Sequence, residues 1–417
     1  MPPLTSQKPK RAVFHGWRIL VLATLTGALT GPGQTIGVSV FIDHIIEDLA
    51  LTRSEVSIAY LIGTMLGALT LPTVGRWIDR VGVKRAITLI GAAFAVALVA
   101  MGGVANFITL AAGFTFIRLL GQGALSLAST VAVTHWFARR RGMALGIYMT
   151  AVTILIGLVP VLLNLAIGTT TWRTAWLIAA VAIFITVVPI GRFGMISYPS
   201  DIGEVPDGHA AVAAAKEVHT PGRSLTRAEA VRTVPFWIIL SMSAVTGAWA
   251  TALNFHQISL LGEAGLSASA AALMFLPQVV GGAAAALAFG ALTDRVQARW
   301  LIPMAMGFLA TAQLLVPSLS PGVLVFFYSA ALGMAGGSTR SISAAFLPKW
   351  FGTAHIGAIS AVITFAGVVG SAIGPVTFSI GRDVLGGYGS TAAWLAVLPI
   401  GVALAALTLL DNRRRAN

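Results

Sequence analysis

Long apolar segments constrain this chain more than any other feature of its sequence. A helix needs about 20 apolar residues to cross a hydrocarbon core that is roughly 30 Å thick. Twelve such segments lie near 16–41, 54–77, 86–105, 107–135, 143–168, 172–194, 235–261, 267–292, 300–318, 321–347, 353–381 and 390–410. Lipid offers no hydrogen bonds to a peptide backbone, so each segment is predicted to be a helix. The expected fold class is an all-α membrane protein with twelve transmembrane helices.

Charged residues are scarce enough to exclude an ordinary soluble domain. They make up 10% of the 417 residues, whereas a soluble domain carries about 25%. The chain has no cysteine, which excludes disulfides and cysteine-bound metals. No group of residues resembles a metal site, a nucleophilic triad or a phosphate-binding loop. We therefore expect neither a cofactor nor enzymatic activity.

Lysine and arginine predict the orientation of the spans. If both termini are cytoplasmic, most of the 27 lysines and arginines fall in the tails and inside loops, as the positive-inside rule requires. Arg53, Arg173 and Arg382 then occupy outside loops. The net charge of +13 therefore reflects topology rather than nucleic-acid binding. We expect a monomeric, multi-pass protein of the cytoplasmic membrane.

One long polar stretch divides the spans into two sets of six. Residues 1–194 are predicted to form an N-terminal bundle, and 235–417 a C-terminal bundle. The segment between them, 195–234, is predicted to be a cytoplasmic linker. Its last part, "SLTRAEAVRT", predicts a short surface helix that Ser224 caps.

The two sets of spans repeat each other. "GRWIDRVGVKR" at 75–85 and "GALTDRVQARW" at 290–300 share the pattern G-x-x-x-D-R. Pro160 and Pro375 occupy matching places in the fifth and eleventh spans. Repeats of this kind predict two pseudo-symmetric six-helix bundles with a binding site between them near the midplane. Such bundles alternate access by rocking.

The loop after the second span resembles the signature of the major facilitator superfamily, G-x-x-x-D-R-x-G-x-R-R. Here the pattern is carried by Gly75, Asp79, Arg80, Gly82, Lys84 and Arg85, and a partial second copy contains Asp294 and Arg295. The resemblance implies a transporter whose loops latch the bundles together on the cytoplasmic side. The alternative is a charge cluster that only fixes topology.

A narrower resemblance points to one branch of that superfamily. "WFARRRGMALGIYMTA" at 136–151 and "FHGWRI" at 14–19 are similar to motifs of monocarboxylate transporters and oxalate/formate exchangers. Those families hold the carboxylate with an arginine of the eighth span. The eighth span here contains no arginine.

Two arginines, Arg118 and Arg340, are predicted inside spans, and none of the 14 acidic residues is. A cation at the centre of a membrane helix costs about 2.5–3.5 kcal/mol on insertion scales, and arginine does not lose its proton. An anionic substrate is therefore the expected partner, and a cationic-drug exchanger is disfavoured. The alternative for Arg118 is that it binds backbone carbonyls of neighbouring helices.

The residues around these arginines predict a polar cavity. Arg118, Gln122 and Ser126 recur at helical spacing and should share one face. Glycines before Arg340 allow close helix packing. Further candidates for substrate binding are Gln34, Tyr148, Thr153, Asn254, His256, Gln278 and Tyr328.

Proton coupling has two candidate residues. His256 is predicted within the seventh span, and histidine titrates near neutral pH, although a lone buried histidine is commonly a packing residue. Asp43, beside His44 at the mouth of the first span, is the second candidate.

These patterns together predict a secondary transporter that moves a small organic anion, expected to be a carboxylate, by alternating access. Moving one charge against the membrane potential costs about 2.3 kcal/mol per 100 mV. Proton symport removes that cost and is the favoured coupling. Anion exchange, drug efflux by proton antiport, and a receptor or channel without a transport cycle are the alternatives.

Overall fold

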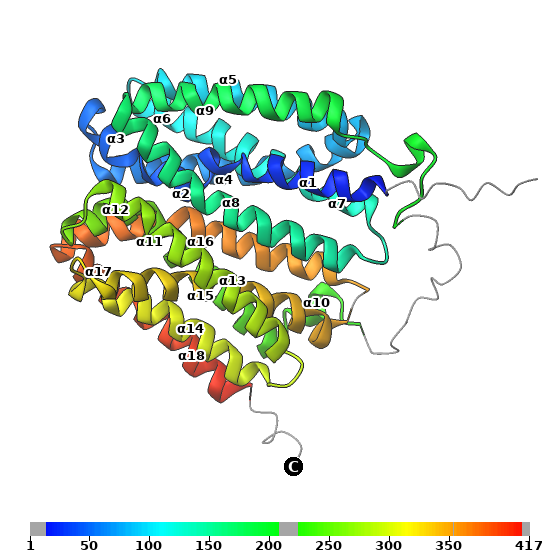
Figure 1. Ribbon diagram of the computed structural model, residues 1–417. Coiled ribbons are helices and arrows are strands. Elements are labelled where there is room, and N and C mark those ends of the chain that lie inside the picture. The colour runs from blue at the N-terminus through cyan, green and yellow to red at the C-terminus, as the bar shows by residue number, and fades with distance from the viewer. Residues whose placement is uncertain (1–13, 208–223, 353, 411–417) are drawn as a thin grey trace, which may run out of the picture.

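A computed structural model describes residues 14–207, 224–352 and 354–410. Nearly all of these residues are helical (Figure 1). Within them, eleven helices are long and apolar enough to cross a membrane. The predicted all-α membrane fold is therefore confirmed.

The twelfth predicted span is α15, Val323–Phe351, which is as long as the other spans but less apolar. Its middle contains Gly336, Gly337, Ser338, Thr339 and Arg340. The least apolar of the long helices is therefore one that carries an interior arginine.

The N-terminal bundle contains the first six spans, drawn from blue to green in Figure 1. The first span is broken at a 3-10 turn, Gly31–Gly33. The helices are α1 (His15–Ala28), α2 (Thr35–Ser39), α3 (Ile42–Leu49), α4 (Arg53–Val81), α5 (Val83–Gly102), α6 (Phe107–Ile117), α7 (Ser126–Trp136), α8 (Arg141–Thr169) and α9 (Trp172–Pro189).

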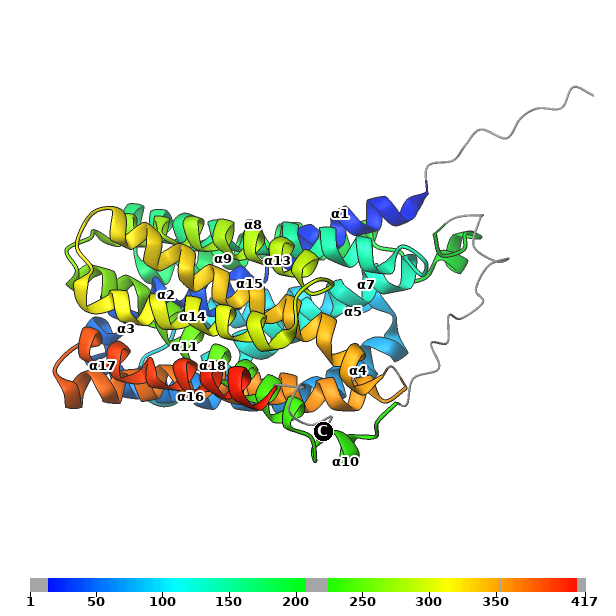
Figure 2. The ribbon, with the colours of Figure 1, turned by 90° about the horizontal axis from the view of Figure 1, so that it is seen from below.

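The C-terminal bundle contains the other six spans and lies beside the first (Figures 1 and 2). Besides α15, its helices are α11 (Val234–Glu263), α12 (Ala268–Leu273), α13 (Phe275–Leu292), α14 (Ala298–Leu315), α16 (Ile356–Leu385), α17 (Tyr388–Leu395) and α18 (Val397–Leu409). We call the end where α1 begins and α18 ends the terminal face, and the other end the opposite face.

The packing between the bundles follows the sequence repeat. The second span, α4, packs on the eleventh, α16, and the fifth span, α8, packs on α12 and α13 of the eighth. The second and eighth spans correspond in the repeat, as do the fifth and eleventh. An exchange of the two halves therefore exchanges the two contacts, as a pseudo-twofold relation requires.

The fourth span departs from the expected straight α-helix. Arg118–Leu125 forms a π-helix between α6 and α7, and such segments are frequent at functional sites. The predicted face of Arg118, Gln122 and Ser126 is correct only in part, because a π-helix changes the spacing. Gln122 stays beside Arg118 at a cavity, whereas Ser126 bonds the carbonyl of Gly121.

The surface helix of the linker is shorter than predicted and begins later. α10, Arg227–Ala230, has four residues, and its cap is Thr226 paired with Glu229 rather than Ser224. The linker residues 208–223 lie outside the described residues. Before that gap, Asp207 accepts hydrogen bonds from the backbone N–H groups of Ala138, Arg139 and Arg140, which holds the start of the linker against the N-terminal bundle.

Two glycines of α15 set the distance to α13. A methyl group added at Gly333 would collide with the carbonyl oxygen of Gln278, and one at Gly337 would collide with that of Gly282. Small residues let membrane helices approach to backbone contact. This contact fixes the position of Gln278 relative to Arg340, which lies further along α15.

We predict that Gly333→Ala lowers the free energy of unfolding by about 1–3 kcal/mol, because an added methyl group overpacks this contact. Gly290→Ala, in α13, is the matched control because nothing lies within 4 Å of its added methyl group. Thermal unfolding in detergent measures both. Equal stability of the two variants would contradict the close contact.

Candidate functional site

A cavity of about 230 Å³ lies between the two bundles. The N-terminal bundle contributes residues of α2 and α8, and the C-terminal bundle contributes residues of α11, α13 and α15. The lining residues are Ile36, Thr153, Ile156, Ala250, Asn254, Gln278, Val279, Gly282, Leu332, Gly333, Gly336 and Arg340. Most are apolar, and the polar ones come from four different helices.

Among the described residues that line this cavity, Arg340 is the only charged one. It keeps accessible surface although it lies within a long helix of the bundle, and it is one of the residues that line the cavity. Its Nη1 atom lies 3.5 Å from the position of a methyl group built on Gly336. Within the described part of the chain, Arg340 forms no hydrogen bond or ion pair. It therefore presents uncompensated positive charge to the cavity.

An amide pair faces the same cavity. Gln278 of α13 donates from Nε2 to Oδ1 of Asn254 of α11 at 2.8 Å. The other polar atom of Gln278, Oε1, is buried and has no partner among the described residues. A buried polar atom without a partner costs free energy, so this acceptor calls for a donor from a ligand or water.

Arg118 lies at a second, smaller cavity of about 120 Å³, and protein groups hold it. Nε donates to Thr64 at 3.1 Å, and Nη1 donates to the carbonyl of Gly33 and to Thr35 at 3.4 Å. The guanidinium group also lies over the ring of Tyr60, 4.7 Å from its centre. The alternative expectation for Arg118 is a bond to a backbone carbonyl of a neighbouring helix. The hydrogen bond to Gly33 is a contact of that kind.

The two interior arginines therefore lie at separate cavities and differ in their surroundings. Arg118 is 4% exposed and joins three spans of the N-terminal bundle. Gln122 lines the Arg118 cavity, and its Oε1 has no partner among the described residues. Ser371 of α16 closes that cavity from the C-terminal bundle.

Three other predicted binding residues line neither cavity. Gln34 donates to Thr30 at 3.1 Å. Tyr148 is 2% exposed and packs beside Gly27. Tyr328 is fully buried in the C-terminal bundle.

His256 is enclosed by protein. Its Nε2 is 3.1 Å from the carbonyl oxygen of Pro375, and its Nδ1 is 3.4 Å from the hydroxyl of Tyr388. A carbonyl accepts only, so Nε2 carries the proton and Nδ1 accepts from the tyrosine. His256 also stacks on Phe378 and lines neither of the two cavities.

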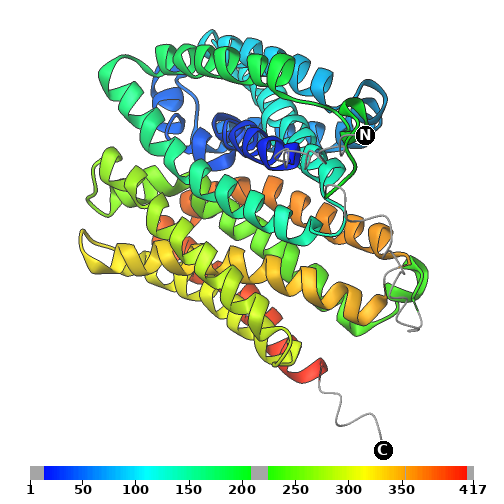
Figure 3. The same ribbon diagram turned by 45° about the vertical axis from the view of Figure 1, so that its right-hand side comes forward.

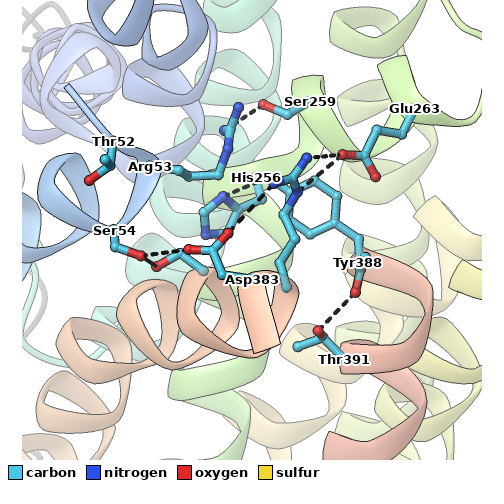
Figure 4. A network of polar contacts seen from close by, with 12 residues as sticks. Thr52, Arg53, Ser54, His256, Ser259, Glu263, Asp383, Tyr388 and Thr391 are labelled. Atoms are coloured by element: carbon cyan, nitrogen blue, oxygen red, sulfur yellow. Dashed lines mark hydrogen bonds and ion pairs between the residues drawn. The ribbon is translucent and has the colours of Figure 1, made fainter. Parts of the chain in front are cut away.

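Asp43 connects the bundles near the opposite face. It accepts from Arg53 at 2.6 Å and from Ser259 of the other bundle at 2.6 Å. Arg53 also donates to Ser259 at 2.8 Å (Figure 4). Beside them, Ser54 donates to Asp383 of α16 at 3.2 Å. The sequence predicts Arg53 in an outside loop. It does not predict the roles of Ser54 and Ser259, because an isolated serine belongs to no recognisable motif.

The predicted latch residues at the terminal face do not join the bundles in this conformation. In the described ranges, Asp79, Arg80 and Arg85 are exposed and form no hydrogen bond or ion pair. Asp294 pairs with Lys349 of its own bundle at 3.1 Å, and Arg295 is exposed.

The two glycines of this loop differ in their roles. Gly82 has φ +79° and is buried against Ser197, a backbone conformation that favours glycine. Gly75 is half-buried, and its nearest neighbour is Leu127.

Polar contacts between the bundles, among the residues described, gather toward the opposite face. They join Asp43 and Arg53 to Ser259, Ser54 to Ser379 and Asp383, and Asn164 to Ser269. Toward the terminal face α14 and α18 slope away from the N-terminal bundle (Figures 1 and 3). Within the described ranges, hydrogen bonds between the bundles therefore close the conformation at one end.

Comparison with known proteins finds a matching family and two similar sequences. The pattern that defines the Major Facilitator Superfamily matches residues 22–375. Two uncharacterized MFS-type transporters from two strains of Mycobacterium tuberculosis are 29% identical over 183 residues. That alignment covers 42% of this chain and 40% of the length of each relative.

Solved structures with the same fold include a bacterial homolog of the human lysosomal transporter Spinster. Its inward-facing, unoccupied form has a TM-score of 0.69 at 16% identity and covers 95% of this chain and 96% of its own. The occupied form has a TM-score of 0.69 at 17% identity and covers 97% and 98%. At these identities the likeness shows the fold alone.

We predict that replacing the two interior arginines by methionine changes the free energy of unfolding differently. Arg118→Met leaves Thr64 and a main-chain carbonyl without their partner and lowers the free energy of unfolding by about 1–3 kcal/mol. Arg340→Met removes an unpaired interior charge and leaves stability unchanged or raises it. Thermal unfolding in the same detergent measures both variants. If Arg340→Met were less stable than Arg118→Met, the assignment would be contradicted.

Proposed function

We propose that this chain, which belongs to the major facilitator superfamily and is a membrane transporter, carries a small organic anion. The observation that carries the proposal is Arg340, an interior cation that faces a cavity between the bundles without an acidic partner in the described chain. An arginine in that setting needs a carbonyl, water or an anion beside it.

The cavity suits a small carboxylate better than a large anion. Its volume of about 230 Å³ is about one and a half times that of a roughly 150 Å³ protein cavity that binds benzene. The guanidinium group binds a carboxylate through two parallel hydrogen bonds. Ile36, Ile156 and Leu332 provide apolar surface for the rest of the molecule. Because residues from both bundles line the cavity, a bound anion contacts both moving parts.

The proposed transport cycle follows from the one-sided closure. The terminal face is taken as cytoplasmic, in agreement with the positive-inside rule, and the protein is taken as a resident of the cytoplasmic membrane. The contacts of Asp43, Arg53 and Ser54 then close the outer side. To face outward the protein breaks these contacts and forms new ones at the terminal face, where Asp79 and Arg80 are exposed and Asp294 is exposed beside Lys349.

We propose proton symport with Asp43 as the coupling residue. Asp43 receives hydrogen bonds from both bundles and is 42% exposed, so solvent protons reach it. A proton on its carboxylate removes the charge that pairs with Arg53 and weakens the outer closure. His256, enclosed between Pro375 and Tyr388, is less suited to this role, because each ring nitrogen already has a protein partner.

A second candidate function, efflux of apolar compounds, is favoured by a larger cavity. It measures about 560 Å³ between α11, α16 and α18, and Trp249, Phe365 and Leu398 are among its apolar residues. None of the described residues that line it is charged. Resistance to lipophilic compounds that is lost on Trp249→Ala but kept on Arg340→Met would favour this function over anion transport.

We predict that Arg340→Met reduces uptake of small carboxylates into proteoliposomes by about 10- to 100-fold, since charge-assisted hydrogen bonds are worth about 1.5–3 kcal/mol. Arg340→Lys keeps the charge but loses the planar fork, so it should retain part of the uptake. Arg173→Met, which breaks an ion pair with Asp48 inside the N-terminal bundle, is the control and should transport normally. Normal uptake by Arg340→Met would refute the anion site.

We predict that Asp43→Asn abolishes accumulation driven by a pH gradient and preserves exchange of labelled for unlabelled anion. An asparagine resembles a permanently protonated aspartate, so the cycle runs without proton uptake. Asp48→Asn is the matched control: Asp48 also pairs with an arginine at 2.6 Å, but within one bundle. Proton-driven accumulation by Asp43→Asn would rule out the coupling role.

A further inference from the structure

We propose that the Asn254–Gln278 amide pair recognises a hydroxyl group on the transported anion, so that the cargo is a hydroxylated carboxylate. The inference rests on the proposed function, because it requires a carboxylate at Arg340. It adds a second recognition group to the same cavity and thereby narrows the class of substrate.

The hydrogen-bonding state of the pair is the first argument. Gln278 uses Nε2 on Asn254 Oδ1, and its own Oε1 remains buried without a partner in the described chain. Asn254 keeps its Nδ2 donor, since the bond between the two side chains uses only Oδ1. Gln278 Nε2 and Asn254 Nδ2 each keep at least one unused N–H, so the pair has at least one donor and one acceptor without a protein partner in the described chain.

This result does not depend on which way the amides are oriented. Side-chain amide oxygen and nitrogen are assigned from the hydrogen-bond network. If both groups are turned over, Asn254 donates to Gln278, and the pair then presents a free Nε2 and a free Oδ1. Either arrangement leaves one donor and one acceptor for a ligand.

A hydroxyl group fits this combination because it donates one hydrogen bond and accepts others. A second carboxylate accepts only and would leave the amide oxygen unpaired. An ammonium group donates only and would add a cation to a cavity that already holds Arg340. A methyl group would leave both amide atoms unsatisfied, at a cost in affinity.

Both recognition groups come from residues that lie near the same stretch of α15. Gly333 packs against the backbone of Gln278, and the guanidinium group of Arg340 reaches back along α15 to Gly336. Gly333 and Gly336 are three residues apart, about 4.5 Å along the helix axis.

Pairs of acids that differ by one hydroxyl test the proposal. The purified full-length protein in proteoliposomes is assayed with propanoate, 2-hydroxypropanoate and 3-hydroxypropanoate as competitors of one another's uptake. We expect at least one hydroxylated acid to bind about tenfold more tightly than propanoate, the effect of one buried polar atom left unpaired.

Gln278→Met keeps the shape of the side chain and removes its polar atoms. In this variant the affinity for the hydroxylated acid should fall to the affinity for propanoate. The affinity for propanoate itself should not change. Gln313→Met is the control: Gln313 is fully buried in the C-terminal bundle and its side-chain amide has no partner in the described chain, but it does not line the cavity. It should keep the wild-type ratio.

The outcomes separate the two proposals. If wild-type protein takes up propanoate and the hydroxylated acids equally well, the hydroxyl site is refuted and the anion site stands. If the hydroxyl preference persists in Gln278→Met, the amide pair does not read the hydroxyl. If no carboxylate is bound or transported, both proposals fail.

Discussion

An arginine inside a membrane helix needs a group beside it that replaces water, and the architecture around Arg118 and Arg340 follows from that need. Arg118 obtains hydroxyl groups, a carbonyl and the face of Tyr60 from the helices around it. Arg340 obtains a cavity. One arginine therefore joins three spans of the N-terminal bundle, and the other lines a cavity without a protein partner in the described chain.

The pseudo-symmetric packing places the cavity of Arg340 between the two bundles. The cavity at Arg340 is lined by both bundles, and the contacts that close the opposite face also join both. In the proposed cycle, a ligand at the cavity and a proton at Asp43 would act on the same equilibrium between two arrangements of rigid bundles. Coupling between cargo and proton requires only that both favour the same change of state.

The sequence predicted the fold well because the hydrophobic signal is long and repeated. Twelve apolar runs predicted the spans, and two copies of one loop motif predicted the two bundles. It predicted Arg340, Asn254 and Gln278 as candidates, and the structure places all three at one cavity. It failed at the π-helix after Arg118 and at the cap of α10, because such local choices depend on packing and single hydrogen bonds.

An experimental structure of the protein with a small carboxylate at saturating concentration tests the central claim most directly. The account predicts ligand density against the guanidinium group of Arg340, with the rest of the molecule between Ile156 and Leu332. A structure in which Arg340 is fully occupied by protein carbonyl or carboxylate oxygens, with only water in the cavity, would contradict it.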